Sequence, residues 1–347
     1  MFNKNTRRTI ATMTFATLIL GSCTTTETTP AQPFDDGVIV VNEGNFTSND
    51  GSLSFITRNS TTATLDIFQK ENTRSLSGSL AGYNEVDEKG IILVDNSSAG
   101  KDLIEIVNAR TFKSIATIKD DIENPRDIAK VGTNKIYVTC WGTNSDFSFK
   151  TSYIAVVDLT TNKVTKKIPL GTDCESVIVV GTNAIVGTIY NGLKNIRVID
   201  TQKDEISASI EVGANPGNFV IDASNKIWMT AGAEIVLFNP TTKMIESRIK
   251  AGTANKTPNG LAISKDQKTL YYNYNSEVTS LNIADGSTKT FIKRKFSAIG
   301  FDNESNQVYT TLIPSYKQAG YIFRYQPTGV LIDSVKVEIA PVGFFFK

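Results

Sequence analysis

From residue 37 onward the chain consists of short apolar or alternating segments separated by Gly, Asn, Asp and Pro. No long segment shows the 3.6-residue period of an amphipathic helix, whereas runs of four to six residues bounded by turn formers are typical of strands. Representative runs are Gly37–Asn42, Ile136–Cys140, Tyr153–Asp158, Ile196–Asp200, Ile227–Thr230 and Thr269–Asn273. The pattern predicts an all-β fold.

These strands recur in a repeat of about forty to fifty residues, in which one strand ends at a polar residue that opens a tight turn. Asn and Asp favour this position because their side chains bond the backbone two residues on. The polar positions are Thr57, Asn108, Asp158, Asp200, Asn239, Asn282 and Gln326. An X-Pro pair precedes a new strand at Asn124-Pro125, Asn215-Pro216 and Thr257-Pro258. Seven copies of about four strands predict a seven-bladed β-propeller; a solenoid, the alternative, usually has a shorter period and parallel strands.

The two ends of the repeat region predict how the ring closes. The first repeat shows three strands, at Val38–Asn42, Leu53–Thr57 and Thr64–Phe68, and the apolar run Val342–Phe346 has no repeat of its own. We expect this last run to form the innermost strand of the first blade, which would leave no long sheet edge exposed. The predicted propeller domain therefore covers residues 37–347.

The first 36 residues have the features of an export signal and a tether. Residues 1–22 begin with Lys4, Arg7 and Arg8 and continue into an apolar run that is too short to span a bilayer. The sequence Leu20-Gly21-Ser22-Cys23 resembles a bacterial lipobox, which implies cleavage before Cys23 and lipid attachment to its thiol. An ordinary secretory signal with a chance Cys is the alternative. Residues 23–36 lack periodicity, and we expect them to be a flexible tether.

The amino-acid composition excludes several classes of function. The chain has 36 Lys and Arg, 35 Asp and Glu and no His, and residues 1–22 contain three of the basic residues and none of the acidic ones. A mature protein without excess positive charge has no general attraction to nucleic acid. The lack of His excludes Ser-His-Asp and Cys-His nucleophiles and His metal sites. We therefore expect a binding protein rather than an enzyme, with no cofactor and no resident metal.

Cys140 and Cys174 fall in neighbouring repeats and on the same face of the predicted propeller. An exported protein is exposed to an oxidising environment. A disulfide and a pair of small buried apolar residues are both compatible with the sequence, because the sequence does not give the Cα separation that a bridge requires.

In a propeller, the connections between the second and third strands of each blade share one face with the links into the next blade. Here these connections are rich in aromatic rings and amides, which offer contact area to a ligand at a small entropic cost. Individual rings can instead fold inward over the core. The aromatic residues are Phe46, Trp141, Phe147, Phe149, Tyr190, Tyr274 and Tyr316. The predicted ligand-binding residues are Asn42, Glu43, Phe46, Trp141, Tyr190, Asn191, Asn218, Tyr274 and Tyr316.

Carboxylates on this face raise the alternative of a metal site. Hydrolytic propellers coordinate a divalent cation with Glu, Asn and Asp at the channel mouth, and Glu43, Glu175 and Asn218 could imitate that set. No spacing singles these three residues out, so solvated loop charges are the better interpretation.

The opening run Val40-Val41-Asn42-Glu43-Gly44-Asn45-Phe46, followed by Asp50-Gly51-Ser52-Leu53, adds a family resemblance. With the lipobox and the seven repeats, residues 37–347 resemble the YncE-like surface lipoproteins of Bacteroidota. This group includes the BtuG-type proteins, which capture cobalamin at the cell surface and pass it to a TonB-dependent transporter. The resemblance implies a ligand-capture protein that is lipid-anchored in the outer membrane, with cobalamin as ligand and such a transporter as partner. A protein-interaction scaffold and a metal-dependent hydrolase or lactonase are the alternatives.

Overall fold

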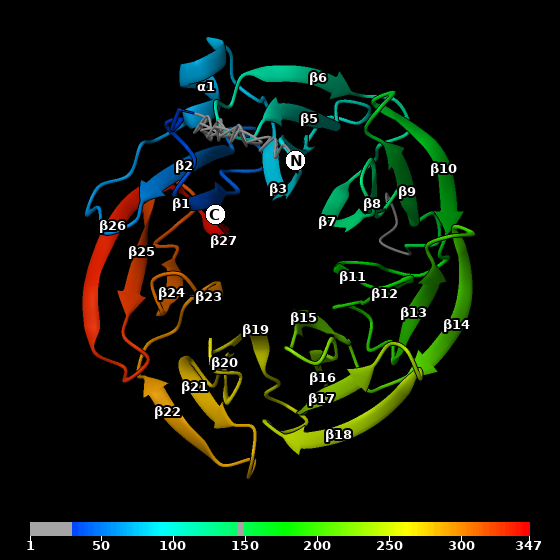
Figure 1. Cartoon of the computed structure of the whole chain (residues 1–347), viewed down its shortest axis with the longest axis vertical. Coiled ribbons are helices and arrows are strands. Elements are labelled where there is room, and N and C mark those ends of the chain that lie inside the picture. Colours follow the sequence, from blue (N-terminus) through cyan, green and yellow to red (C-terminus); the bar gives the residue numbers. More distant parts are fainter. Residues whose placement is uncertain (1–29, 144–148) are drawn as a thin grey trace, which may run out of the picture. The chain divides into compact units, whose positions relative to one another are not determined.

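Seven antiparallel sheets surround a common axis in the computed structural model of the chain, which describes residues 30–143 and 149–347 (Figure 1). They belong to one unit that extends from Gln32 to Lys347. The predicted all-β, seven-bladed propeller is confirmed. The predicted signal peptide (residues 1–22) and the lipid attachment site Cys23 lie outside the described residues.

Six blades contain four consecutive strands, which we call A to D from the axis outward. In blades 2 to 4 the strands are β3 (Ser79–Val86), β4 (Lys89–Asp95), β5 (Leu103–Asn108) and β6 (Ser114–Ile118); β7 (Pro125–Val131), β8 (Lys135–Cys140), β9 (Tyr153–Asp158) and β10 (Lys163–Pro169); and β11 (Val177–Val180), β12 (Asn183–Val186), β13 (Asn195–Asp200) and β14 (Glu205–Glu211). In blades 5 to 7 they are β15 (Gly217–Ile221), β16 (Ile227–Ala231), β17 (Glu234–Asn239) and β18 (Met244–Lys250); β19 (Asn259–Ile263), β20 (Thr269–Tyr274), β21 (Glu277–Asn282) and β22 (Thr288–Ile292); and β23 (Ile299–Asp302), β24 (Gln307–Leu312), β25 (Ala319–Tyr325) and β26 (Leu331–Ile339).

Blade 1 joins the two ends of the chain. Its order is β27 (Pro341–Phe346), β1 (Gly37–Asn42) and β2 (Ser52–Thr57), and β27 pairs antiparallel with β1. The last strand of the chain is therefore strand A of the first blade, as predicted.

The expected third strand of this blade, Thr64–Phe68, was wrong. Thr64 forms a single β-bridge with Phe55, and the chain then turns into the short helix α1 (Ile67–Asn72). Asp66 caps this helix by accepting a hydrogen bond from the Gln69 amide, and consecutive Ile67 and Phe68 are both buried. A strand would have pointed these two side chains to opposite faces. Among the described residues, no helix has the length and apolar character to cross a membrane.

The repeated polar residue closes strand C in each blade, or follows it directly in blade 7. Asn108, Asp158 and Asn239 accept hydrogen bonds from the backbone amides two residues on, at 3.0, 2.7 and 3.0 Å. These C–D turns and the A–B turns form one face of the ring, which we call the turn face. The B–C loops and the D–A links form the opposite face, the loop face.

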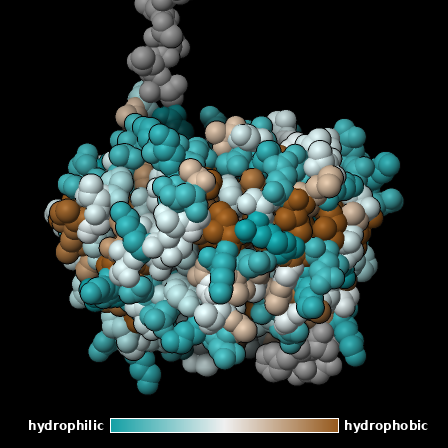
Figure 2. Space-filling view, turned by 90° about the horizontal axis from the view of Figure 1, so that it is seen from below, coloured by the Kyte–Doolittle hydropathy of each residue, from teal (hydrophilic) through white to brown (hydrophobic). Residues whose placement is uncertain are grey.

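The hydrophobic core lies between neighbouring blades, where the apolar faces of strands B and C meet. The outer strands are different: side chains of β18 alternate between exposed and half-buried positions. Figure 2 shows the rim that carries β18 and β22, where hydrophilic side chains dominate and apolar groups are separated. Charged side chains along such outer strands oppose edge-to-edge pairing.

Packing begins before residue 37, inside the segment that we expected to be a tether (residues 23–36). Phe34 is buried, with its ring centroid 5.3 Å from that of Phe55 and 5.1 Å from that of Phe112. Asp35 forms an ion pair of 2.6 Å with Arg110, which lies in the C–D turn of blade 2. The chain therefore joins the propeller at the turn face.

Candidate ligand-binding face

Two neighbouring cavities open on the loop face. A cavity of about 600 Å³ lies among the loops of blades 1 to 4, and we call it the acidic pocket. A cavity of about 800 Å³ lies over blades 4 to 6, and we call it the amide pocket. The B–C loop of blade 4 separates them, because Ile189 lines the amide pocket and Tyr190 lines the acidic pocket.

Arg126 is the central cation of the acidic pocket. Its Nη1 donates to Asp95 Oδ2 at 2.7 Å, and its guanidinium carbon lies 4.4 Å from the centroid of the Trp141 ring. The Trp141 indole N–H donates to the Cys174 carbonyl at 2.8 Å, which fixes the ring. A stacked guanidinium with a paired charge is a rigid floor for a ligand.

Three aromatic rings from blades 3 and 4 form one wall. The centroid of Trp141 lies 5.1 Å from that of Phe149 and 5.6 Å from that of Tyr190. Phe149 and Tyr190 stack at 5.9 Å with an interplanar angle of 7°. Phe149 is buried, whereas Tyr190 is 41% exposed and Phe46, contributed by blade 1, is 45% exposed. The wall is therefore formed without ligand, and Tyr190 from this wall and Phe46 from blade 1 keep their rings accessible.

Burial weakens the acidity of three carboxyl groups in this region. Burial raises the pKa of Asp95 to about 6, against the opposing charge of Arg126, and raises the pKa of Glu175 to about 7. Burial also raises the pKa of Glu43. At neutral pH Asp95 and Glu175 are close to the point where they exchange protons, so these two groups can serve as hydrogen-bond donors as well as acceptors.

The described part of the chain contains no group of three Cys, Asp or Glu side chains placed to hold a metal ion. Glu43 lines the acidic pocket, and Asn218 lines the amide pocket. Glu175 is near Arg126, with 3.9 Å between Oε1 and Nε.

Five of the nine predicted ligand-binding residues line the two cavities. Glu43, Phe46, Trp141 and Tyr190 come together in the acidic pocket, although they belong to three different blades. Asn218 lines the amide pocket.

The other four predicted residues line neither cavity. Asn42 is fully buried, and its amide donates to the Ser54 hydroxyl at 3.0 Å within blade 1. Asn191 is an exposed turn residue with φ of 60°. Tyr274 packs partly buried against the core of blade 6, which is the inward-folded alternative. Tyr316 is 51% exposed, and the negative charge of Glu43 raises its pKa. Phe147 lies outside the described residues.

Sequence reasoning missed Arg126, Asn215 and Asn259. All three belong to the segments that open strand A, and strands β7, β15 and β19 each carry a register shift within their first residues. Such bulges redirect side chains. The X-Pro pairs were the available signal, because each marks the place where strand A begins at the channel mouth.

The two cysteines are free and buried, so the disulfide alternative was wrong. The Cys174 thiol donates to the Cys140 carbonyl at 3.4 Å, which confirms the expected proximity across neighbouring blades. Burial raises the pKa of Cys140 to about 12, so this thiol stays protonated and unreactive.

Fold and site together define a seven-bladed β-propeller with ligand-sized cavities on one face. The chain belongs to the family described as a domain of unknown function, DUF5074, whose model matches residues 36–342. A search of curated proteins gives no match.

Solved structures support the fold. A quinonprotein alcohol dehydrogenase-like protein from Bacteroides thetaiotaomicron is similar with a TM-score of 0.69 and 17% identity, over 88% of this chain and 78% of that one. The extracellular domain of a putative one-component system from B. thetaiotaomicron has a TM-score of 0.57 and 12% identity, over 79% of this chain and 39% of that one. Hydrazine synthase from Kuenenia stuttgartiensis has a TM-score of 0.53 and 15% identity, over 67% and 73%. At these identities the likeness concerns the propeller fold alone.

The raised carboxyl pKa values predict an unusual pH dependence of stability. In the folded state the pKa is about 7 for Glu175 and about 6 for Asp95 and Asp127, whereas it is about 4 in the unfolded chain. At pH values between the folded and unfolded pKa, the folded protein therefore binds more protons than the unfolded chain. Stability is therefore expected to fall as the pH rises from 5.5 to 8. The chain has no His to titrate in this window.

Thermal unfolding followed by circular dichroism at pH 5.5, 6.5 and 8 measures this effect. We expect the Tm to decrease by a few degrees with rising pH, and the isosteric variant Glu175→Gln to show a smaller decrease. Glu205→Gln, at a fully exposed site on the rim strand β14, is the matched control and should follow the unmodified protein. A Tm that increases between pH 5.5 and 8 would contradict the prediction.

Proposed function

We propose that the protein is a lipid-anchored binding protein of the outer membrane that captures a small molecule in the acidic pocket and passes it to a TonB-dependent transporter. The corrinoid cobalamin is the proposed ligand, by resemblance to the BtuG-type group. The observation that carries the capture function is the convergence of Glu43, Phe46, Trp141 and Tyr190 on one preformed cavity of about 600 Å³. Capture requires binding without covalent chemistry.

The pocket offers complementary roles for its side chains. The exposed rings of Phe46 and Tyr190, from blades 1 and 4, supply stacking surface, and Trp141 lines the same cavity. Glu43, which lines the cavity and whose pKa is raised by burial, offers its carboxyl group to the neutral amide edges of a corrinoid. With no His in the chain, the protein would leave the axial base of the ligand in place.

The orientation of the propeller supports this role. Phe34 and Asp35 attach the N-terminal segment to the turn face, opposite both cavities. A lipid on Cys23 would then hold the turn face toward the membrane, and the loop face would remain open to a ligand and to a transporter.

A protein-interaction scaffold is the second candidate. It would be favoured by a broad apolar patch on the loop face. Of the exposed aromatic rings there, Phe46 and Tyr190 line a cavity, and Tyr316 lies outside it. This arrangement favours a small ligand over a flat docking surface.

Gel filtration of residues 24–347 with cyanocobalamin, followed by the visible absorbance of the corrinoid, tests the proposal. We expect co-elution with the protein, and a loss of affinity of about tenfold or more for Tyr190→Ala, because an exposed aromatic anchor is removed without disturbing the core. Tyr274→Leu, which alters a loop-face tyrosine outside the pocket, should bind normally. Clean separation of corrinoid and protein at micromolar concentrations would overturn the corrinoid assignment.

A further inference from the structure

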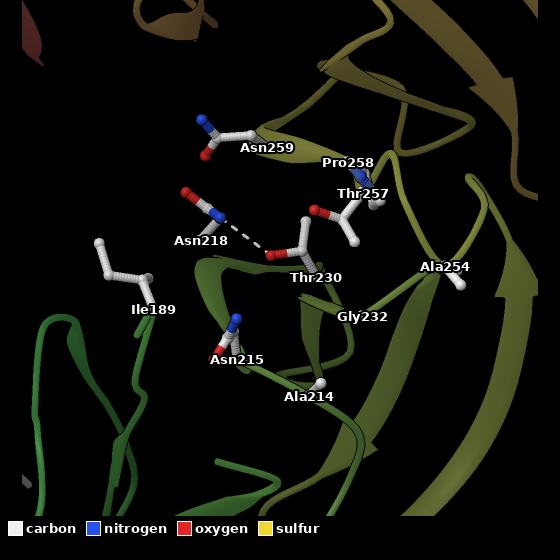
Figure 3. Close-up of a pocket in the computed structure, with 11 residues that line it drawn as sticks. Ile189, Ala214, Asn215, Asn218, Thr230, Gly232, Ala254, Thr257, Pro258 and Asn259 are labelled. Carbon is white, nitrogen blue, oxygen red and sulfur yellow. Dashed lines mark hydrogen bonds between the residues drawn. The ribbon is translucent and has the colours of Figure 1, made fainter. Parts of the chain in front are cut away.

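Among the described residues, the amide pocket differs from the acidic pocket in having no ionisable side chain on its walls. Its polar groups are the amides of Asn215, Asn218 and Asn259 and the hydroxyls of Thr230 and Thr257, which surround the open space in Figure 3. Small apolar side chains, such as Ile189 and Pro258, complete the lining. A volume of about 800 Å³ is within the range of small-molecule sites.

One of these polar atoms lacks a partner within the described chain. Asn215 Oδ1 is buried and accepts no hydrogen bond there. Asn218 Nδ2 donates to the Thr230 hydroxyl at 2.9 Å, and that hydroxyl donates to the Gly217 carbonyl at 3.1 Å. This chain of bonds fixes the Asn218 amide so that its oxygen points into the cavity (Figure 3). Buried amide atoms without partners are costly, and they are expected to meet a ligand or water.

The backbone at two of these amides adopts the left-handed conformation. Asn215 and Asn218 have φ of 50° and 52°, in the left-handed region, and Asn218 lies in the bulge of β15. At the corresponding place in blade 3, the amide of Asn124 donates to the Gly142 carbonyl at 2.8 Å and so is occupied within the protein. The amide of Asn215 has no such bond to a loop carbonyl.

The two pockets also differ in the charge of the residues that open strand A beside them. The residues that follow the X-Pro pair are Arg126 and Asp127 in blade 3, but Gly217 and Asn218 in blade 5. A charged ligand placed in the amide pocket would lose hydration without an opposite charge to replace it. A neutral ligand would lose less and would find both donors and acceptors.

We infer that the amide pocket is a second binding site, which takes a neutral ligand rich in hydroxyl groups, the chemistry of a sugar. A hydroxyl donates to an amide oxygen such as Asn215 Oδ1 and at the same time accepts from an amide N–H, and the apolar part of the wall suits the C–H faces of a sugar ring. This site goes beyond the proposed function, because it does not depend on what the acidic pocket binds.

Saturation-transfer NMR with maltotriose, cellotriose and triacetylchitotriose at millimolar concentration tests the inference on residues 24–347. We expect at least one of these sugars to bind, with an affinity that is unchanged between low and high salt because no charge is involved. The double variant Asn215→Gly, Asn218→Gly removes both amides while keeping the left-handed backbone that Gly adopts freely. It should weaken binding by about tenfold or more.

Asn225→Gly is the matched control, since Asn225 has φ of 57° and lies in the A–B turn of the same blade, on the opposite face. This variant should bind the sugar normally. Failure of all three sugars to bind, or binding that survives in the double variant, would overturn the inference.

Cyanocobalamin binding measured on the same variants separates the two proposals. We expect the double variant to retain it, because the proposed corrinoid site is the acidic pocket. Loss of corrinoid binding in the double variant would overturn the assignment of a separate second site, whereas absence of corrinoid binding in every variant would count against the proposed function alone.

Discussion

Deletion of residues 342–347 is expected to unfold the propeller. These residues contain most of β27, the strand A that completes blade 1, and their removal would uncover β1, all of whose residues are buried. Phe344 and Phe346 pack against Tyr309 with centroid distances of 5.8 and 5.2 Å, and Phe345 packs against Tyr83 at 5.3 Å. The loss of one buried Phe side chain costs about 3–5 kcal/mol. Three half-buried rings and a strand ladder together are comparable to the whole stability of a typical domain, about 5–15 kcal/mol.

Near-UV circular dichroism and thermal unfolding measure this effect. We expect the truncated chain to lose its fixed aromatic signal and its cooperative transition. A truncation that removes residues 24–31 is the control and should leave the Tm unchanged, because the packed unit begins at Gln32.

A chain in which β27 is moved to a position before β1 provides a further test of ring closure. The Lys347 amide donates to the Gly37 carbonyl at 3.0 Å, so the end of β27 lies beside the start of β1. Placing residues 341–347 before Gly37 through a short hairpin turn, in a chain that ends at Ala340, should restore the cooperative transition. A truncated chain that melts like the intact protein would show that the ring does not depend on this strand.

Arg126→Met is expected to destabilise the protein at pH 8 by about 3 kcal/mol, in the range measured when one partner of a buried ion pair is removed. The Arg126 and Asp95 side chains are 17% and 7% exposed, and Glu175 and Glu43 lie close enough to feel the same guanidinium. Met preserves much of the volume of the side chain over Trp141, so the change removes mainly the charge. The carboxylates would then be buried without a counter-ion.

The pH dependence of this loss identifies its cause. Because the pKa of Asp95 is already about 6 and that of Glu175 about 7, both groups are largely protonated at pH 5, and the loss should be small there. Denaturant unfolding at pH 5 and pH 8 measures the two values. The double variant Arg126→Met, Asp95→Asn should recover part of the stability at pH 8. An equal loss at both pH values would instead indicate lost packing over Trp141.

The fold could be predicted because its signals are local. The polar residue at the end of strand C, such as Asn108 or Asp158, forms its hydrogen bond with the backbone two residues away. The Thr64–Phe68 segment was mistaken for a strand because its apolar residues fit a short strand pattern. Its helix depends on the Asp66 cap and on burial of Ile67 and Phe68 against the first blades, and the second of these is a tertiary effect.

The candidate site was predictable in place but not in detail. Several loop aromatics lie on the loop face, yet Tyr274 packs against the core shared by blades 5 and 6 whereas Tyr190 reaches the cavity. Both are loop tyrosines next to Asn, and the sequence has no feature that separates them. The direction of each ring depends on which neighbouring blade it meets.

The sequence by itself determined the number of blades, the face that carries the B–C loops and the closing role of the last strand, because period, turn chemistry and strand alternation are properties of short segments. Only the tertiary structure decided that Arg126 pairs with Asp95 over Trp141 and that the mouth divides into an acidic and an amide pocket. The ion pair joins blades 2 and 3, and each pocket is lined by residues from several blades. The burial that raises the pKa values therefore exists only when the blades are packed together.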